Sequence, residues 1–598
     1  MGCNLSIGIN SKKVLQRRYL LRNEKGEIVE TPSQLFRRVA RAIASVEIKY
    51  NKKSNVKKTE DDFYKIMLNL EFLPNTPTLM NAGTKIGQLS ACFVIPVEDS
   101  LQGIFDAAKW TAIIHQSGGG TGFDFSKLRP KGDTVESSGG AASGPVAFMT
   151  IFDKITDVIK QGGSRRGANM GILRVDHPDI LEFITCKSNQ NFLNNFNISV
   201  AVTDEFMKSV EKNKAYSLIN PRSKQTVGKL NAKEIFDLIV INAWKSGDPG
   251  IIFIDEINRA NPTPKIGKIE ATNPCGEQPL LSWESCNLGS INLSKVIKEK
   301  RIDWDKLRRL VRLGVRFLDD VIDANKYPVQ EIKAITCANR KIGIGVMGFA
   351  DALIKMNIPY NSKKALQIAE KIMAFIEKEG HNASQQLGKE RGNFPNFEYS
   401  IWKTKKKYKY MRNATVTTIA PTGTISIIAG CSSGIEPLFA ISFIRNVMEG
   451  TRLHETNHVF EEIAKKRKFF SQELLNQIAK IGSIQRITNI PKNVQRIFVT
   501  ALDISPDWHI EMQSAFQKYT DNAVSKTINL SENTAPGDVG NAYLLAHQLK
   551  CKGITVYRYG SKPDQVLTIG YLEKGYGEKQ IVADSEFAGG CEGIVCPH

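Results

Sequence analysis

Strand-like and helix-like segments alternate along most of this chain, from about residue 73 to about residue 560. Short β-prone runs such as SACFVIPV, NISVAV, IIFID and ATVTTIA are separated by amphipathic stretches such as EIFDLIVINAWKSG and KALQIAEKIMAFIEKEG. This alternation predicts a large α/β domain whose sheet is either open or closed into a barrel. No internal repeat or low-complexity linker divides the region, so we expect residues 73–560 to form one domain.

The two ends of the chain differ from this central region. Residues 13–70 have apolar positions at helical spacing, and Thr31 followed by a proline is typical of a helix start. After about residue 560 the sequence is rich in glycine and charge and poor in apolar periodicity. The expected organisation is therefore a small N-terminal helical domain (1–72), the large α/β domain (73–560) and a flexible C-terminal tail (561–598).

Composition argues against several classes of protein. No stretch approaches the roughly 18 unbroken apolar residues of a membrane span, and the start lacks the pattern of a secretion signal. We expect a soluble cytoplasmic protein with no membrane partner, whose thiols are reduced unless a disulfide is transient and catalytic. With ten cysteines, eight histidines and neither a Cys-x-x-Cys nor a His-Glu-x-x-His motif, a protein-ligated metal is not expected.

The formal net charge of +20 has two interpretations. The basic clusters NKKSNVKK, WKTKKKYKY and AKKRKFF are short and scattered, which is typical of solvated helix faces and loops. Attraction to polyanions, either nucleic acid or nucleotide phosphates, is the alternative. Charge alone does not separate the two, and direct nucleic-acid binding is not expected.

The stretch NPCGEQPLLSWESCNLG, residues 273–289, carries most of the visible chemistry. It places Asn273 and Glu277 on either side of Cys275, with Cys286 eleven positions further on. The surrounding glycines, prolines and polar residues are typical of a loop that exposes its side chains. Two thiols in such a loop are candidates for reactive groups.

Three further cysteines bear on the same question. Cys92 lies in the apolar run LSACFVIP, where an inert core cysteine is the more frequent case. Cys591 and Cys596 follow two glycines near the C-terminus, where a tethered dithiol can exchange with a buried disulfide. Together these positions suggest an interior that consumes two reducing equivalents per turnover and a tail that restores them.

Two glycine-rich stretches are candidate anion sites. In APTGTISIIAG, a loop with Thr422, Gly423, Thr424 and Ser426 follows a strand-like run and could bind a phosphate, especially if a helix starts there, although a plain turn is the commoner case. In KQGGSRRGANMG, glycines precede Arg165 and Arg166, so this loop either binds an anion or carries solvated arginines.

These residues, taken in order, carry a resemblance to a known family. PNTPTLMNAG, LSACFVIP, QGGSRRGANMGIL, ATNPCGE, ESCNLGSINLS, GIGVMGFAD, APTGTIS, SSGIEP and TVYRYGS follow one another as in the catalytic chain of ribonucleotide reductases. The chain resembles most closely the adenosylcobalamin-dependent class II enzymes, over nearly its full length. The resemblance implies a ten-stranded α/β barrel with a central finger loop.

The resemblance also implies roles for the cysteines and their neighbours. Cys275 looks like the residue that becomes a thiyl radical and removes hydrogen from ribose C3′, with Glu277 as general base and Asn273 as a hydrogen-bonding partner of the hydroxyls. Cys92 and Cys286 resemble the pair that is oxidised to a disulfide as the 2′-hydroxyl leaves. Cys591 and Cys596 resemble the tail pair that reduces it again, and a thioredoxin-like or glutaredoxin-like reductant is implied.

Nucleotide-binding residues follow from the same likeness. It assigns Thr422, Gly423, Thr424 and Ser426 to the substrate phosphates, Ser90 to the ribose, and the NTPT run with Thr76 to the base. A dNTP effector is implied at Asp99 and Arg129, with the loop of Gly163, Arg165 and Arg166 relaying its identity. In the family this effector site lies at a homodimer interface.

The radical source is the remaining question. Chains that receive the radical from a separate metal-containing subunit carry two adjacent tyrosines, whereas here Tyr557 is followed by Arg558 and then Tyr559. A C-terminal glycyl-radical motif is also missing. The favoured cofactor is therefore adenosylcobalamin. The alternative is a class I-type catalytic subunit that needs a separate metal-radical subunit.

Other properties are implied less directly. Only about seventy residues precede the catalytic core, so we expect specificity control by dNTPs without the ATP and dATP on/off switch. Likeness to dimeric members favours diphosphate over triphosphate substrates. A nucleic-acid-binding protein would leave the ordered cysteines without a role, and a plain thiol-disulfide oxidoreductase would leave the phosphate loop, Asn273 and Glu277 unexplained.

Overall fold

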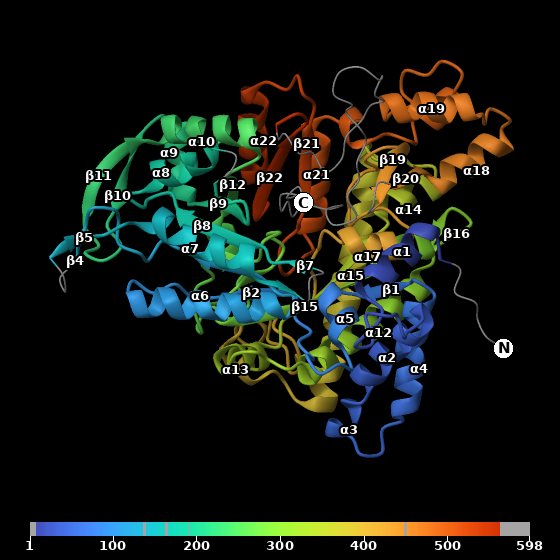
Figure 1. Ribbon diagram of the computed structural model, residues 1–598, viewed down its shortest axis with the longest axis horizontal. Coiled ribbons are helices and arrows are strands. Elements are labelled where there is room, and N and C mark those ends of the chain that lie inside the picture. Colours follow the sequence, from blue (N-terminus) through green and yellow to red (C-terminus); the bar gives the residue numbers. More distant parts are fainter. Residues whose placement is uncertain (1–6, 136–138, 162–164, 190–191, 448–450, 562–598) are drawn as a thin grey trace.

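The computed structural model describes residues 7–135, 139–161, 165–189, 192–447 and 451–561. Figure 1 shows a central set of strands, an N-terminal helical layer beside it and further helices around it. Within the described residues, no helix combines the length and the apolar character needed to cross a membrane.

Four helices form the N-terminal layer: α1 (Ile9–Arg18), α2 (Pro32–Ala44), α3 (Glu47–Tyr50) and α4 (Val56–Leu68). The predicted start of α2 is confirmed, since the Thr31 hydroxyl accepts a hydrogen bond from the Gln34 N–H and the Gln34 side chain accepts one from the Thr31 N–H. The apolar faces of α2 and α4 pack on each other and on helix α12 (Trp304–Ala324). This layer is thereby joined to the large domain through a shared core.

Ten strands form the main sheet, in the order β1-β15-β2-β3-β8-β9-β12-β22-β21, with β18 on the other edge of β15. Their bounds are β1 (Phe72–Pro74), β2 (Cys92–Val94), β3 (Gly120–Asp124), β8 (Asn169–Arg174), β9 (Phe196–Val202), β12 (Gly250–Phe253), β15 (Glu284–Asn292), β18 (Ile342–Met347), β21 (Thr527–Leu530) and β22 (Gly553–Arg558). Strands β2, β3, β8, β9 and β12 are neighbours in this order, and each pairs in parallel with the next. Strand β15 pairs with β2 in the antiparallel sense.

Backbone bridges bring the two ends of this sheet together. Ile344 in β18 pairs with Thr417, and Ile419 in the same segment pairs with Val524, just ahead of β21. The Ile419 N–H donates to the Ala523 carbonyl at 3.2 Å. The sheet is therefore continued from β18 to β21 into a barrel, as the family resemblance implies; the alternation of strands and helices alone left it open or closed.

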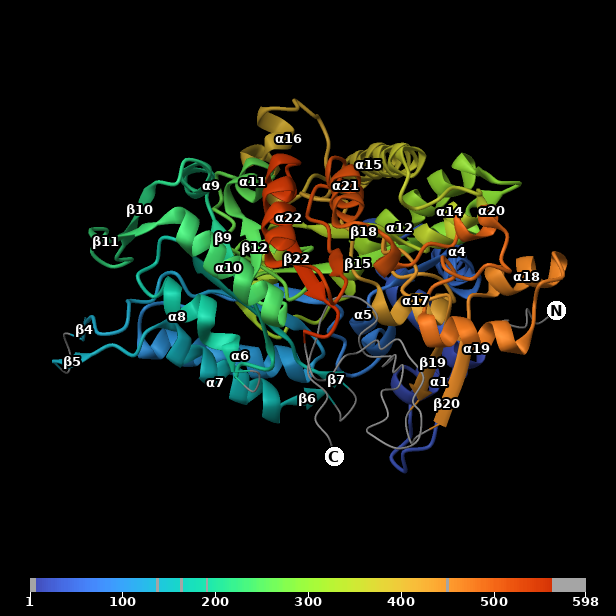
Figure 2. The same ribbon diagram turned by 90° about the horizontal axis from the view of Figure 1, so that it is seen from above.

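The other elements surround this barrel, and Figure 2 shows α21 and α22 beside the last strands. The remaining helices are α5 (Thr76–Asn81), α6 (Leu101–Gln116), α7 (Pro145–Val158), α8 (Ile180–Thr185), α9 (Asp204–Glu211), α10 (Ala232–Ser246), α11 (Ile254–Arg259), α13 (Gln330–Asn339), α14 (Phe349–Lys355), α15 (Lys363–Arg391), α16 (Ile401–Thr404), α17 (Gly423–Ala429), α18 (His458–Lys466), α19 (Gln472–Ile481), α20 (Lys492–Gln495), α21 (Pro506–Gln517) and α22 (Pro536–Gln548). Six two-stranded hairpins complete the fold: β4 (Thr134–Val135) with β5 (Gly140–Ala141), β6 (Lys160–Gln161) with β7 (Arg165–Arg166), β10 (Ala215–Ile219) with β11 (Thr226–Asn231), β13 (Ala271–Thr272) with β14 (Pro279–Leu280), β16 (Ile297–Lys298) with β17 (Arg301–Ile302), and β19 (Ser442–Val447) with β20 (Thr451–Thr456).

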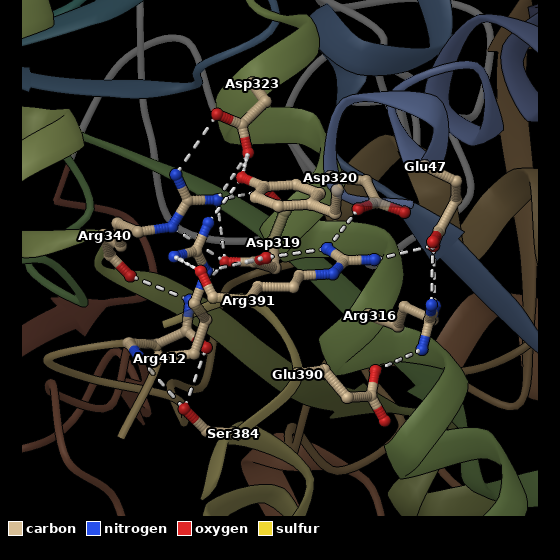
Figure 3. Close-up of polar contacts among 12 residues, drawn as sticks. Glu47, Arg316, Asp319, Asp320, Asp323, Arg340, Ser384, Glu390, Arg391 and Arg412 are labelled. Atoms are coloured by element: carbon tan, nitrogen blue, oxygen red, sulfur yellow. Dashed lines mark hydrogen bonds and ion pairs between the residues drawn. The ribbon is translucent and has the colours of Figure 1, made fainter. Parts of the chain in front are cut away.

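A buried network of charged side chains fastens the N-terminal layer to the barrel domain (Figure 3). Nη1 of Arg391 donates to Asp319 at 2.9 Å and to Asp320 at 2.6 Å, and all three side chains are at most 1% exposed. Nη2 of Arg391 reaches Glu47 of α3 at 2.7 Å. Burial alone would raise the pKa of Asp319, but the neighbouring guanidinium groups outweigh it and lower that pKa to about 2.

Removing one partner from this network should be costly, because the opposite charges stay buried without compensation. We expect Arg391→Met to lower the free energy of unfolding by about 3–5 kcal/mol, as measured by chemical denaturation. The control Lys233→Met breaks an exposed pair with Asp237 and should cost less than about 1 kcal/mol. Equal effects of the two substitutions would contradict a structural role for the network.

Candidate active site

The hairpin of β13 and β14 lies inside the barrel. Glycine is required where it crosses β3, because a Cβ atom on Gly122 would stand 1.8 Å from the Thr272 carbonyl oxygen. The tip of the hairpin, residues 273–278, is the part of the predicted loop 273–289 that does form a loop. The prediction is wrong for Cys286, which lies in strand β15 and is fully buried, because the second half of the stretch pairs with other strands of the barrel.

Hydrogen bonds from several parts of the barrel wall hold the loop tip. The Pro274 carbonyl accepts from Asn197 of β9 at 2.9 Å, and the Glu277 carbonyl accepts from the Ala523 N–H and the Thr418 hydroxyl, both at 3.0 Å. Within the tip, the Asn273 side chain accepts from the Gln278 N–H at 2.9 Å. The loop is therefore fixed by β9 and by the two neighbouring segments that carry Thr418 and Ala523, as a precise reactive group requires.

Cys92 and Cys286 lie directly opposite each other on β2 and β15, although 194 residues separate them in sequence (286 − 92). Directly opposite residues of antiparallel strands have Cα atoms about 4.5–5.5 Å apart, which is within the range of a disulfide. Both thiols are reduced and both residues are buried, with exposures of 3% and 0%. The register therefore places the two cysteines within reach of a disulfide bond.

Cys275 lies beside this pair at the end of the loop. Asn273 Nδ2 is 3.2 Å from Cys92 Sγ, which brings the amide and the first cysteine of the pair together. Cys275 is half-buried and is disulfide-bonded in this structure. Its thiol takes part in chemistry only once that bond is reduced.

Glu277 is a buried carboxyl group with unused hydrogen-bonding capacity. It is 2% exposed, and its Oε2 atom has no hydrogen-bond partner within the described part of the chain. Burial raises its pKa to about 7, against an opposing hydrogen bond from Asn273. A carboxyl group with a pKa near neutrality is suited to exchange a proton with a bound hydroxyl.

Two cavities meet at Cys275. The first lies on the side of Cys92 and Glu277 and is lined by residues 75–77, 91–92, 119–120, 168, 273–275, 277, 288–290 and 420–425. The second lies among the ends of β9, β12 and β22 and is lined in part by Pro274, Cys275, Lys526 and Tyr557. A group on Cys275 is therefore accessible from both.

The expected phosphate-binding loop borders the first cavity. Thr422, Gly423 and Thr424 line it, and α17 begins at Gly423, as the phosphate interpretation requires. Thr422 adopts a left-handed conformation, with φ of 59°, and its hydroxyl accepts from the Gly434 N–H at 2.7 Å. Ser426 is instead buried one turn further on, where its hydroxyl contacts Gly423 and Ser433.

The two other predicted substrate residues differ in position. Thr76, at the first turn of α5, lines the first cavity, and its hydroxyl lies 2.9 Å from that of Tyr19. Ser90 does not line the cavity. It is buried, and its hydroxyl accepts from Asn325 at 3.0 Å and from Ser285 at 3.3 Å.

Among the described residues predicted to bind the effector, none lines either cavity at Cys275. Arg129 Nε donates to Asp99 at 2.9 Å, next to the start of α6, and both side chains are about one-quarter exposed. Arg165 and Arg166 form the short strand β7, and Gly163 lies outside the described residues. Cys591 and Cys596 of the tail are also outside them.

Comparisons with known proteins agree with this geometry. Residues 5–87 match "Ribonucleotide reductase, all-alpha domain", and residues 90–557 match "Ribonucleotide reductase, barrel domain". The chain belongs to the ribonucleotide reductase family. The second match covers the β13–β14 hairpin as well as strands β2 and β15, which carry Cys92 and Cys286.

Two relatives are similar to this reductase over nearly all of the chain. A protein of Thermoplasma acidophilum is 52% identical over 97% of this chain and 82% of its own length, and one of Mycobacterium tuberculosis is 47% identical over 99% and 83%. Both are named vitamin B12-dependent ribonucleoside-diphosphate reductase. The class Id ribonucleotide reductase alpha subunit of Actinobacillus ureae shares the fold, with a TM-score of 0.75 at 24% identity over 93% of this chain and 97% of its own.

Residues 557 and 558 bear on the route of a radical in this reductase. Tyr557 lines the second cavity, whereas the guanidinium group of Arg558 lies 4.2 Å from the centre of the Trp244 ring and its Nε donates to the Trp244 carbonyl. Successive strand residues face opposite sides, so the position after Tyr557 points away from Cys275. A pair of adjacent tyrosines leading to Cys275 is not formed.

A buried ion pair close to Cys286 escaped the sequence interpretation. Lys341 Nζ lies 2.6 Å from Glu284 Oε2, and both side chains are fully buried. Glu284 is visible two residues before Cys286, but nothing in the sequence connects it with a lysine 57 positions later (341 − 284).

The raised pKa of Glu277 predicts a pH-dependent stability difference. Between pH 4.5 and about 7 the unfolded chain releases this proton before the folded chain does, so stability falls as pH rises. Across this window the free energy of unfolding of the wild type should fall by about 3 kcal/mol relative to that of Glu277→Gln, as measured by chemical denaturation at several pH values.

A matched control is available on an exposed turn. Glu24→Gln should leave the pH dependence of stability unchanged, because Glu24 is exposed. If Glu277→Gln and the wild type show parallel profiles from pH 4.5 to pH 7, Glu277 ionises normally and the proposed desolvation is wrong.

Proposed function

We propose that this chain reduces ribonucleoside diphosphates to 2′-deoxyribonucleoside diphosphates for DNA synthesis and repair, with adenosylcobalamin as the source of the radical. The observation that carries the proposal is the position of Cys275 between two cavities, one lined by Cys92, Glu277 and the start of α17, the other on the opposite side of the loop. The names of the two relatives support the cofactor and the diphosphate substrate.

The second cavity adjoins Cys275 and is the proposed site for the nucleoside part of the cofactor. A Cβ atom on Gly250 would stand 3.1 Å from the Ser199 hydroxyl and 3.3 Å from the Ile554 carbonyl, so glycine lets the neighbouring strands approach closely at this wall. Gly250, Ser199, Ile554 and Tyr557 would hold the nucleoside part of the cofactor. When bound, adenosylcobalamin supplies the radical equivalent that converts the Cys275 thiol to a thiyl.

The remaining steps fall to residues of the chain. The thiyl of Cys275 removes the 3′-hydrogen, and Glu277 takes the proton of the 3′-hydroxyl while Asn273 hydrogen-bonds the ribose hydroxyls. The 2′-hydroxyl leaves as water after protonation by a thiol of the Cys92–Cys286 pair. That pair supplies two electrons and becomes a disulfide, and Cys275 returns hydrogen to C3′. The net change is one ribonucleotide and two thiols to one deoxyribonucleotide, one disulfide and water.

The phosphates are proposed to bind at the start of α17. There Thr422, Gly423 and Thr424 line the cavity, and backbone N–H groups and hydroxyls of such residues suit a phosphate. Thr76 would lie near the base, and Ser90 would act on the ribose only through Ser285 or Asn325, because it does not line the cavity.

A homodimer with a dNTP effector site is part of the proposal. Leu101 and Phe105 on one face of α6 are 66% and 53% exposed, and Val158 at the end of the adjacent α7 is 69% exposed. Exposed apolar residues of this size favour a protein interface. Asp99 and Arg129 adjoin α6, and the loop of Gly163, Arg165 and Arg166 follows α7, so the effector would bind beside this interface.

The chain is further proposed to work in the cytoplasm with a thioredoxin-like or glutaredoxin-like dithiol as reductant. Cys591 and Cys596 would transfer the electrons to the buried pair. The division into residues 1–72, 73–560 and 561–598 remains part of this proposal. A separate metal-radical subunit is not favoured, since Arg558 packs on Trp244 where a relay would need a second tyrosine.

The function is tested by turnover without a second protein. With a dithiol, dNTP effectors and adenosylcobalamin, the reduced chain should convert CDP to dCDP, and omission of the cofactor or Cys275→Ser should abolish conversion because no thiyl forms. Cys186→Ser, a half-buried thiol away from both cavities, should retain most of the activity. Product formed by Cys275→Ser would refute the proposed role of this thiol.

The interface is tested by a charge on α6. Phe105→Glu should give a monomer in sedimentation and remove the response of turnover to dNTP effectors, since a charge in an apolar interface stays unpaired. Val227→Glu, at a 54% exposed position in the β10–β11 hairpin, should leave the dimer intact. A dimer that persists in Phe105→Glu would place the interface elsewhere.

A further inference from the structure

Two segments outside the hairpin supply the donors that hold the Glu277 carbonyl. The Thr418 hydroxyl and the Ala523 N–H each donate to this oxygen at 3.0 Å. Glu277 lies two residues from Cys275 in the same loop tip, so the positions of these donors bear directly on where the thiol lies. Whatever fixes the two segments therefore also fixes Cys275.

Asp521 joins these two segments. Its Oδ2 atom accepts from the N–H groups of Val416 at 2.8 Å and Thr417 at 3.2 Å, directly before Thr418. Its own N–H donates to the Thr417 hydroxyl at 2.8 Å. Because Ala523 follows only two residues later, Asp521 binds the segment that carries one donor to the segment that carries the other.

Two basic side chains contact Asp521 in turn. Nε2 of His381, on α15, lies 3.0 Å from both carboxylate oxygens, and the two side chains are 11% and 10% exposed. Nζ of Lys552 donates to the Asp521 carbonyl at 2.6 Å and also to the Asn522 carbonyl. Asp521 is thereby tied to a long helix and to the residue that precedes β22.

The charges of this group support the same arrangement. Burial alone would raise the pKa of Asp521, but His381 and the N–H groups of Val416 and Thr417 outweigh it and lower that pKa. Burial would lower the pKa of His381, but the Asp521 carboxylate outweighs it and raises that pKa. An ionised carboxylate accepts hydrogen bonds more strongly than a neutral group, so the joint between the segments is firm.

We propose that Asp521 is a positioning residue, which sets the place of Cys275 by clamping together the two segments that hold the Glu277 carbonyl. Asp521 lines neither cavity, so it acts through the loop and touches no substrate. The proposal rests on the proposed function for the reaction that Cys275 performs. A thiol that must meet a single hydrogen atom gains most from such a fixed position, since small displacements are costly in rate.

The clamp is tested by the reactivity of Cys275 in the reduced chain. In Asp521→Ala the loop tip should open more often, and iodoacetamide should alkylate Cys275 about tenfold faster than in the wild type, as measured by peptide mass spectrometry. Thr418→Val removes only one donor to Glu277 and should give an increase of about threefold, which keeps the proposal testable if Asp521→Ala does not fold. The half-buried Cys186, which lines neither cavity, is the internal reference. Equal acceleration of both thiols, or an unchanged rate at Cys275, would overturn the proposal.

Two further variants separate the hydrogen bonds of Asp521 from general destabilisation. Asp521→Asn keeps an oxygen that accepts the N–H groups of Val416 and Thr417 more weakly, and should bring alkylation of Cys275 to within about threefold of the wild-type rate. Asp204→Ala removes another carboxylate that contacts a histidine, and should leave Cys275 unaffected because Asp204 lines neither cavity. The proposal fails if Asp521→Asn is as reactive as Asp521→Ala, or if Asp204→Ala has an effect of the same size.

Turnover provides a readout that a purely structural role would not give. With CDP, a dithiol and adenosylcobalamin, Asp521→Ala should lower kcat about 100-fold and change KM less than about threefold. The phosphate loop should keep its place because the Thr422 hydroxyl has its own hydrogen bond from the Gly434 N–H. A raised KM with unchanged kcat would contradict the proposal. Absence of turnover in the wild type would count against the proposed function alone, because the alkylation experiments do not depend on it.

Discussion

The structure depends on one close packing of backbone against backbone, where the β13–β14 hairpin crosses β3 inside the barrel. Only a glycine at position 122 lets the Thr272 carbonyl approach, and hydrogen bonds from Asn197, Thr418 and Ala523 then fix the loop tip. Because these donors come from separate parts of the wall, the barrel as a whole positions Cys275. A mobile thiol would face neither cavity reliably, and radical chemistry depends on short, fixed distances.

Burial of this loop also sets the chemistry of its side chains. Burial of Glu277 raises its pKa to about 7, and its Oε2 atom, which has no partner among the described residues, can bind a hydroxyl. Cys286 is fully buried, and burial followed by the carboxylate of Glu284 raises the pKa of its thiol well above the usual value. The enclosed charges are correspondingly paired: Lys341 with Glu284, and Arg391 with Asp319 and Asp320.

Much of the fold and part of the site can be predicted from the sequence. Alternating strand and helix patterns indicate the α/β domain, and the capping pair of Thr31 and Gln34 marks the start of α2, because both signals are local. The grouping of Asn273, Cys275 and Glu277 is equally local. The pairing of Cys92 with Cys286 is a matter of strand order, and only the family resemblance anticipates it, since an apolar run around Cys92 is typical of a core cysteine. The Glu284–Lys341 pair and the withdrawal of Ser90 from the cavity depend on packing between distant segments, for which the sequence carries no signal.

The central claim is that the sulfur of Cys275, which lies between the two cavities, removes the 3′-hydrogen of the ribose and later returns hydrogen to C3′. The most direct measurement is competition between CDP and CDP deuterated at C3′, with the isotopic composition of dCDP followed by mass spectrometry at low conversion. Removal of the 3′-hydrogen by Cys275 predicts product enriched in the light isotopologue. Two results together would contradict the account. One is product with the same isotopic composition as the substrate mixture. The other is dCDP formed in the absence of Cys275 that has lost its 3′-deuterium to solvent.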